Sequence, residues 1–175
     1  MAESESTAPR GRMPEVLAED VGHLMGRVAF ALGTREMVAL HELGLTLRSY
    51  GALAVVAEAA RTQTEVAAAT GIDRTTMVAI TDDLEARGLV TRSPAPQDRR
   101  AHHLRATEDG RRLAARARDL VRQVEADGLA DLTAAERGQL LTLLARVAEG
   151  RLGTPVDLAR LPTTTRRRPS TGRLA

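Results

Sequence analysis

Cysteine, tryptophan and lysine are absent from this chain of 175 residues, and its aromatic side chains are limited to Phe30 and Tyr50. The absence of cysteine excludes disulfides, thiolate nucleophiles and cysteine-based zinc or redox sites. Because aromatics are so rare, the core must consist of Leu, Val, Ala, Met and Ile, which suits packed helices better than a β-sandwich. A hydrophobic fraction of 43% and a charged fraction of 27% are typical of a globular protein, here long enough for one domain.

Long hydrophobic runs are absent as well. The N-terminal stretch "MAESESTAPRGRMPE" has no apolar segment of the kind found in secretory signals. No apolar run approaches the roughly 20 residues that span a bilayer. We therefore expect a cytoplasmic protein of bacterial type with no membrane partner. The sequence also shows no nucleophile–base pair, glycine-rich phosphate loop or cluster of metal ligands, so we expect no enzyme activity, no cofactor and no metal.

The net charge of +2 is unevenly distributed along the chain. Residues 1–20 carry a net charge of −3 and residues 151–175 a net charge of +5, which leaves the region between them formally neutral. Any affinity for nucleic acid must therefore come from local patches. One such patch is the stretch 87–105, where five Arg accompany a single acidic residue, Asp98.

Hydrophobic periodicity and capping residues predict helices along most of the chain. Apolar residues recur every three or four positions over about 14–42, where Gly33 and Gly44 interrupt or end the pattern, and a second helix is expected over about 46–60. "TQTE" at 62–65 is a capping box that opens a short helix ending before Gly71. Asp73 is a suitable N-cap for a helix over 74–87, which Gly88 can end.

The second half of the chain predicts a hairpin and two more helices. "LVTRS" and "RAHHLRA" are expected as strands, and "PAPQD" between them as a turn. Thr107 starts a long helix to about 129, and the capping box "TAAE" at 133–136 opens a last helix to about 149. Two helices joined by a short turn at Gly71 and followed by a basic hairpin predict a winged helix-turn-helix. An ordinary αα-hairpin within a bundle is the alternative.

Several motifs together resemble the MarR family of bacterial transcription regulators. They are "GIDRTTMV" and "DDLEARGLV" within residues 71–90, the wing sequence "QDRRA", and the spacing of Leu104, Thr107 and Gly110. Helix order and lengths extend the resemblance over about residues 14–149. The family implies a mainly α fold with a small β-wing, in which a winged helix-turn-helix domain is flanked by dimerisation helices. It also implies a homodimer that binds palindromic double-stranded DNA, and repression relieved by a small, often aromatic or phenolic ligand.

The resemblance and the composition together predict the domain boundaries. A winged helix-turn-helix DNA-binding domain is expected at 46–106, and a helical dimerisation region at 14–45 and 107–149. The flanking segments 1–13 and 150–175 are expected to be disordered tails, since they carry no sustained apolar period. The C-terminal tail is rich in Arg, Thr and Pro, and either contacts phosphates or is simply solvated.

The candidate DNA contacts lie at the start of the helix over 74–87, because recognition helices usually insert by their first turns. They are Arg74, Thr75, Thr76, Val78 and Ala79. Arg74 can read guanine or hold phosphate, and Thr75 and Thr76 can bond phosphate or base, with Thr76 weighted towards phosphate. Val78 and Ala79 can contact only thymine methyl groups or sugars.

The acidic residues Asp82 and Asp83 follow in the second half of the same helix, although DNA is a polyanion. We interpret one of them as holding a neighbouring Arg in place, and assign Asp82 to bracing of the wing or helix. Alternatively, Asp82 accepts a hydrogen bond from a cytosine amino group, or both carboxylates are simply solvated.

The wing contributes Arg99 and Arg100 as further candidate DNA contacts, with Asp98 expected to brace the hairpin. The resemblance implies that the Arg at the wing tip enters the minor groove, and we place it at Arg100, since Arg suits a narrow, negative groove. Solvation of both Arg is the alternative. His102 and His103 are adjacent on a strand and point to opposite faces, so they cannot bind one metal from the same side.

An effector pocket is expected where the dimerisation helices meet the winged helix. Tyr50 stands where family members often have an aromatic residue facing that cavity, and it either lines the pocket or packs in the core. His23 and Arg27 on the first helix could meet an anionic or phenolic ligand. Arg27 could equally form a surface or dimer salt bridge.

The function predicted from the sequence is a homodimeric DNA-binding transcriptional regulator, a repressor released by a small aromatic or phenolic ligand. The alternative is a winged-helix protein-interaction module that has lost sequence-specific DNA binding. Val78, Ala79 and the acidic pair keep this alternative open, because they are unusual in a surface that binds a polyanion.

Overall fold

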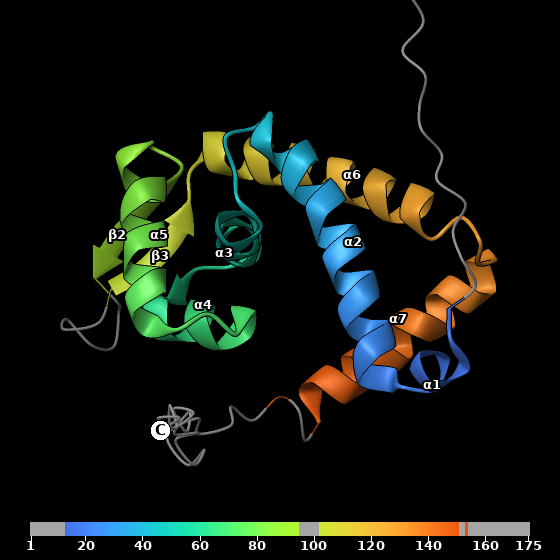
Figure 1. The fold of residues 1–175 in the computed structure, drawn as a ribbon. Helices are drawn as coiled ribbons and strands as arrows, with labels where there is room; N and C mark the ends of the chain where they lie inside the picture. The colour runs from blue at the N-terminus through green and yellow to red at the C-terminus, as the bar shows by residue number, and fades with distance from the viewer. Residues whose placement is uncertain (1–12, 95–101, 151–152, 154–175) are drawn as a thin grey trace, which may run out of the picture. The chain divides into compact units, whose positions relative to one another are not determined.

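The N-terminal segment forms two helices where the sequence predicted one. The computed structural model describes residues 13–94, 102–150 and 153. A break at Glu19 and Asp20 separates α1 (Glu15–Ala18) from α2 (Val21–His41) (Figure 1). The Asp20 backbone is extended, with ψ of 105°, and its carboxylate accepts a hydrogen bond from His23 N at 2.8 Å. The prediction of a single helix over 14–42 was wrong because Asp20 is an N-cap that starts a new helix.

Three helices that form the helix-turn-helix region follow, each started by a side-chain cap. α3 (Leu47–Glu58) begins after Thr46, whose hydroxyl accepts from Ser49 N at 3.1 Å. α4 (Gln63–Thr70) begins at the predicted capping box, and α5 (Arg74–Ala86) begins at the predicted N-cap Asp73. The turn between α4 and α5 contains Gly71 with a φ of 67°, a conformation that glycine adopts without strain.

A small antiparallel sheet forms the base of the wing. β2 (Val90–Pro94) pairs with β3 (His102–Ala106) as predicted, and the connecting residues 95–101 lie outside the described residues. A third strand, β1 (Arg61–Thr62), pairs with β3 and gives the order β1-β3-β2. This strand was not predicted, because two residues are too few to show an alternating pattern.

The long helix α6 (Glu108–Gly128) is joined closely to the start of the wing. Thr107 caps the helix by accepting a hydrogen bond from Gly110 N at 3.0 Å, and donates its own hydroxyl to Gly88 O at 2.8 Å. A Cβ atom at position 110 would lie 2.0 Å from Leu89 O, so only glycine fits there. The spacing of Leu104, Thr107 and Gly110 therefore reflects a close contact between α6 and Leu89, the residue before β2.

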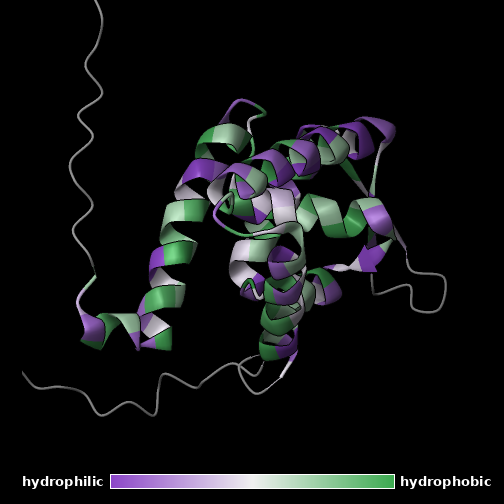
Figure 2. Cartoon of the chain, turned by 90° about the vertical axis from the view of Figure 1, so that its right-hand side faces the viewer, coloured by the Kyte–Doolittle hydropathy of each residue, from purple (hydrophilic) through white to green (hydrophobic). Residues whose placement is uncertain are grey.

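The hydrophobic core surrounds α3, which packs against α4, α5, α6 and β3. Its members are aliphatic, as the composition predicted, and the largest fully buried ones include Leu40, Leu53, Met77, Leu84 and Leu104. Hydrophobic and hydrophilic residues alternate along the helical ribbons in Figure 2, the pattern of helices that bury one face. None of the helices in the described residues is long and apolar enough to cross a membrane.

α7 (Ala134–Glu149) belongs to a second unit of the chain, which begins at Asp131 and is described by itself. It starts at the predicted capping box, where Thr133 N donates to Glu136 Oε2 at 2.8 Å. None of its residues is buried, and Leu141, Leu143, Leu144 and Val147 are exposed.

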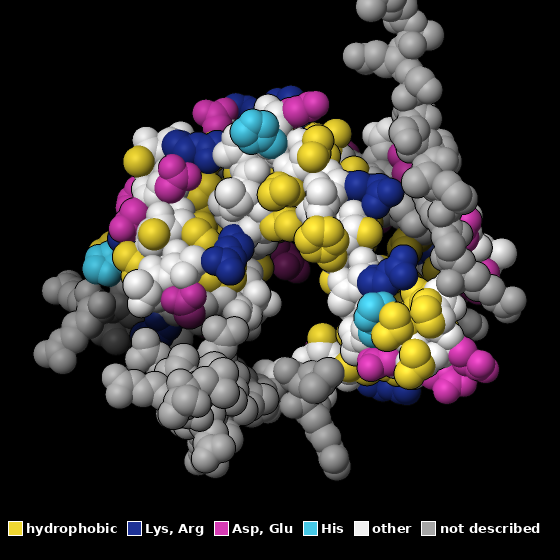
Figure 3. All heavy atoms as spheres, in the orientation of Figure 1, with side chains coloured by type: hydrophobic (Ala, Val, Ile, Leu, Met, Phe, Trp, Pro, Cys, Tyr) yellow, Lys and Arg dark blue, Asp and Glu magenta, His cyan; other side chains and the backbone are white. Residues whose placement is uncertain are grey.

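α2 also leaves many apolar side chains uncovered. Leu40 is its only buried residue, and six large hydrophobic side chains are exposed: Val21, Met25, Val28, Phe30, Met37 and Val38. The space-filling view shows hydrophobic side chains along α2 on the visible face (Figure 3). Each of the two helices therefore leaves several large apolar side chains accessible, as interaction surfaces do.

Candidate nucleic-acid interface

α5 has one buried face and one exposed face. Met77, Thr81 and Leu84 are buried against the core. Of the predicted DNA contacts, Arg74, Thr75, Val78 and Ala79 are exposed and Thr76 is half-buried. The first turns of α5 are therefore accessible, as a helix that enters a major groove requires.

Asp73 holds the start of this helix. Its carboxylate accepts a hydrogen bond from Thr76 N at 2.9 Å, and hydrogen bonds from Thr76 lower the pKa of Asp73 below its ordinary value. The backbone of Thr76 is thus engaged in the cap. Arg74 donates from Nη2 to Thr64 Oγ1 of α4 at 3.1 Å, which ties the only basic residue of α5 to the preceding helix.

Each residue of the acidic pair contacts an Arg from outside α5. Asp82 Oδ1 pairs with Arg92 Nη2 of β2. Asp83 Oδ2 lies 3.3 Å from Arg87 Nη1, and the same nitrogen donates to Gly44 O at 2.9 Å. The two carboxylates are therefore engaged with guanidinium groups of the protein itself.

Arg92 is the hub of a network that the sequence did not reveal. Its Nη2 donates to Thr81 Oγ1 at 3.1 Å, and its Nε lies 3.1 Å from Glu85 Oε2, although that N–H is not aimed at the oxygen. Gln63 Nε2 of α4 also donates to Thr81 Oγ1, at 3.3 Å. We name Gln63, Thr81, Asp82, Glu85 and Arg92 the wing clasp, since they join α4, α5 and β2.

A weak signal for the wing clasp was present in the sequence. Thr81 is a polar residue on the side of α5 that carries Met77 and Leu84, and it is almost fully buried. A buried hydroxyl needs hydrogen-bond partners, and Thr81 donates to Met77 O at 3.0 Å while accepting from other side chains. The identity of those partners depends on how β2 crosses α5, which the local sequence does not encode.

Arg99, Arg100 and Asp98 lie outside the described residues, so their DNA contacts and bracing stay predictions. On the described part of the wing, Arg105 and His102 are exposed and His103 is half-buried.

The residues predicted to line an effector pocket do not all come together. His23 and Arg27 lie along a groove of about 530 Å³ on α2, which Phe30 also lines. Nε2 of His23 is buried and has no hydrogen-bond partner within the part of the chain that the structure describes. Tyr50 does not line this groove; it is half-buried and packs against the core. The assignment of all three to one pocket stays a prediction.

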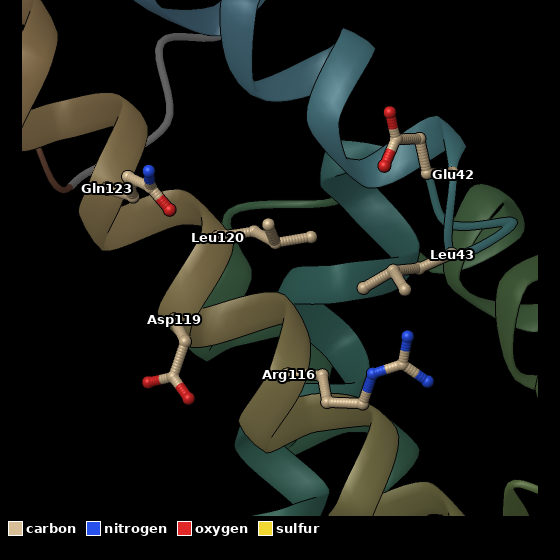
Figure 4. A pocket seen from close by; sticks show the side chains of 6 residues that line it. All are labelled: Glu42, Leu43, Arg116, Asp119, Leu120 and Gln123. Atoms are coloured by element: carbon tan, nitrogen blue, oxygen red, sulfur yellow. The ribbon is translucent and has the colours of Figure 1, made fainter.

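A second pocket lies between the end of α2 and α6, with a volume of about 380 Å³. Leu43 and Leu120 point toward each other across it, and Arg116 extends from α6 beneath them (Figure 4). Glu42 and Gln123 add polar groups, whereas Asp119 points away (Figure 4). Among the described residues, no group of three His, Asp or Glu is placed to hold a metal ion.

Comparison with known proteins decides the family. The sequence profile of the MarR family matches residues 43–101. A candidate transcriptional regulatory protein for the hcr operon of Thauera aromatica is 32% identical over 152 residues, which cover 81% of this chain and 92% of the relative. The chain belongs to the MarR family.

Other MarR-type relatives match over similar lengths. The HTH-type transcriptional repressor NicR of Pseudomonas putida is 31% identical over 146 residues, which cover 82% of this chain and 92% of NicR. CouR of Rhodococcus jostii RHA1, bound to p-coumaroyl-CoA, is 34% identical with a TM-score of 0.72, and the match covers 82% of this chain and 100% of CouR. A structure of CouR bound to a 23-mer DNA duplex has a TM-score of 0.69 at 34% identity, covering 78% of this chain and 99% of CouR. This MarR-family protein is therefore a transcriptional regulator with the winged-helix fold.

Proposed function

We propose that this MarR-family protein is a homodimeric repressor that binds a palindromic operator and is released by a small aromatic or phenolic ligand. The observation that carries the proposal is the exposed N-terminal face of α5 beside a wing joined to it by the wing clasp. Operator binding would place the protein in the cytoplasm, with the chromosome.

The exposed apolar surfaces of α2 and α7 support the homodimer. Phe30 is 79% exposed and Leu141 is 65% exposed in the isolated chain. Apolar patches of this kind mark interaction surfaces, and most soluble oligomers are symmetric assemblies of one chain. A twofold dimer presents two winged helices, and so explains a palindromic target.

The wing clasp supports a role in orientation rather than in overall stability. Asp82 is 56% exposed and Arg92 is 30% exposed. Ion pairs at such exposed positions contribute only on the order of 0.2–1 kcal/mol to stability. Arg92 nonetheless reaches α5 from β2, so the clasp limits the angle between the recognition helix and the wing, which must enter neighbouring grooves together.

A test of DNA binding is fluorescence anisotropy on DNA from upstream of the protein's own gene, beside a scrambled duplex, at several salt concentrations. We expect specific binding in the nanomolar range. The slope of log K against log salt should be several units negative, at about −0.9 per phosphate contact. Arg74→Ala and Arg100→Ala should each weaken binding. A protein-interaction module would instead show no salt-dependent affinity and no effect of Arg100→Ala.

The clasp is tested by Arg92→Gln and by Asp82→Asn. Both variants keep a polar side chain but remove its charge, and both should lower the affinity for specific DNA more than that for scrambled DNA. The circular dichroism spectrum should not change. If Asp82→Asn instead strengthens binding equally to all DNA, the carboxylate acts by simple repulsion and the clasp has no orienting role.

The proposed ligand class follows from the similarity to CouR, whose structure contains p-coumaroyl-CoA. Arg27 and Arg116 line the two described pockets, and neither forms an ion pair with another described residue. Either guanidinium can meet the anionic group of an aromatic ligand. The experiment adds p-coumaroyl-CoA or free p-coumarate to the protein–DNA complex. Loss of release in Arg27→Met or in Arg116→Met identifies the pocket, and no release in the wild type contradicts this ligand class.

A further inference from the structure

The first turns of α5 expose methyl groups at positions from which a recognition helix reads DNA. Thr75, Val78 and Ala79 are exposed, and Val78 keeps 45% of its surface accessible. At 3.6 residues per turn these three residues lie within about 100° of one another around the helix. They form a single surface, which we name the methyl patch.

The charged residues one turn before and one turn after Val78 are already engaged within the protein. Arg74 donates to Thr64 Oγ1 at 3.1 Å, and Asp82 pairs with Arg92. The middle of the exposed face is therefore apolar. Val78 and Ala79 can neither donate nor accept a hydrogen bond through their side chains, so they cannot read base edges by hydrogen bonding.

We propose that the methyl patch recognises operator DNA through the 5-methyl groups of thymine, with Val78 as the main contact. Thymine carries the only methyl group on a base edge in the major groove of unmodified DNA, and apolar side chains discriminate it by direct contact. Contact with sugars is the other arrangement open to these side chains, and it carries no sequence information. The inference rests on the proposed DNA-binding function, and names what its recognition helix reads.

The experiment first selects duplexes that bind the wild-type protein from a random library. Each thymidine of the selected duplex is then replaced in turn by deoxyuridine, which removes one methyl group and keeps the base pairing. At one or two positions in each half-site the affinity should fall about 3- to 5-fold, the effect of one buried methyl group. The remaining substitutions should be neutral, and they serve as internal controls.

The variant Val78→Ala assigns the effect to the methyl patch. At the sensitive position it should bind the thymine and uracil duplexes with nearly equal affinity, because the contacting side chain is gone. Val38→Ala is the matched control, since it makes the same truncation at an exposed valine of α2. It should keep the ratio between the two duplexes, even if its overall affinity changes.

The outcomes separate this inference from the function on which it rests. If the selection enriches no sequence, the proposed DNA-binding function fails and the inference fails with it. If a sequence is enriched but every uracil substitution is neutral, DNA binding stands and thymine recognition is overturned. A uracil effect that persists unchanged in Val78→Ala would show that another residue reads the methyl group, and would also overturn the inference.

Discussion

Gly110 provides the sharpest test of how the wing is joined to α6. In a helix, Gly→Ala ordinarily stabilises by about 1 kcal/mol. Here the added Cβ would lie 2.0 Å from Leu89 O, well below the 3.0 Å that real contacts respect. Leu89 O also accepts a hydrogen bond from Thr107 N at 3.0 Å, so moving this carbonyl weakens a second interaction.

The magnitude follows from these opposing effects. Overpacking costs about 1–3 kcal/mol, and a lost hydrogen bond costs about 1 kcal/mol more. After the gain in helix propensity, Gly110→Ala should destabilise the protein by about 2 kcal/mol, which lowers Tm by about 4–8 °C. Urea and thermal unfolding followed by circular dichroism measure both quantities.

The control is Ala115→Gly, a reciprocal change at an exposed position of the same helix. Ala115→Gly should lower the free energy of unfolding by only about 1 kcal/mol, through helix propensity alone. The two variants together test the reasoning, because propensity predicts opposite signs for them whereas the close contact predicts that both destabilise. A Gly110→Ala protein as stable as the wild type, or more stable, would refute the contact between α6 and Leu89.

Three further predictions concern charge and assembly. Hydrogen bonds to Glu65 and Asp73 lower the pKa of each below its ordinary value, so their contribution to stability is present above about pH 4.5 and is lost as the pH falls below it. The variant Glu65→Gln/Asp73→Asn keeps both caps without titrating, so it should lose less stability than the wild type in urea titrations between about pH 5 and pH 3. Burial, and to a smaller extent the charge of Glu125, raise the pKa of Glu36, so the ionised form of Glu36 destabilises the fold. Glu36→Gln should therefore raise Tm at pH 7 and change it little at pH 4. An unchanged Tm at pH 7 would contradict a destabilising charge at Glu36. Leu141→Asp places a charge on the exposed apolar face of α7 and, under the proposed dimer, should shift the protein towards monomer in sedimentation analysis.

Local signals made most of the fold predictable. The Thr62–Glu65 capping box and the Asp73 cap mark helix starts because each involves residues three positions apart. The final helices were predicted from the same kind of signal at Thr107 and Thr133, whereas the wing strands were predicted from composition and a weak alternation. Asp20 was missed although it is an N-cap too, because the apolar period runs past it on both sides. Hydrophobic periodicity shows which face of a helix is buried. It does not show that the backbone of a single residue departs from helical geometry.

The site was less predictable because its contacts depend on tertiary structure. An acidic pair in a DNA-reading helix raises the expectation of an Arg partner, but it does not say which Arg. Among the described residues, the partner of Asp82 is Arg92, ten positions away on β2. Thr81 could not be recognised as a shared acceptor until α4, α5 and β2 were brought together.

The contacts of Asp82 and Asp83 explain why two acidic residues occur in the C-terminal half of α5. Asp82 ties the helix to β2 through Arg92, and Asp83 ties it to the turn after α2 through Arg87 and Gly44 O. Both contacts lie in the C-terminal half of α5, and the N-terminal turns contain no acidic side chain after the N-cap Asp73. Because each carboxylate has a guanidinium partner within the protein, its repulsion of a phosphate backbone is reduced. Under the proposed function, Asp82 and Asp83 thus fix the position of α5 against the rest of the protein, while the N-terminal turns of α5 form the surface that contacts DNA.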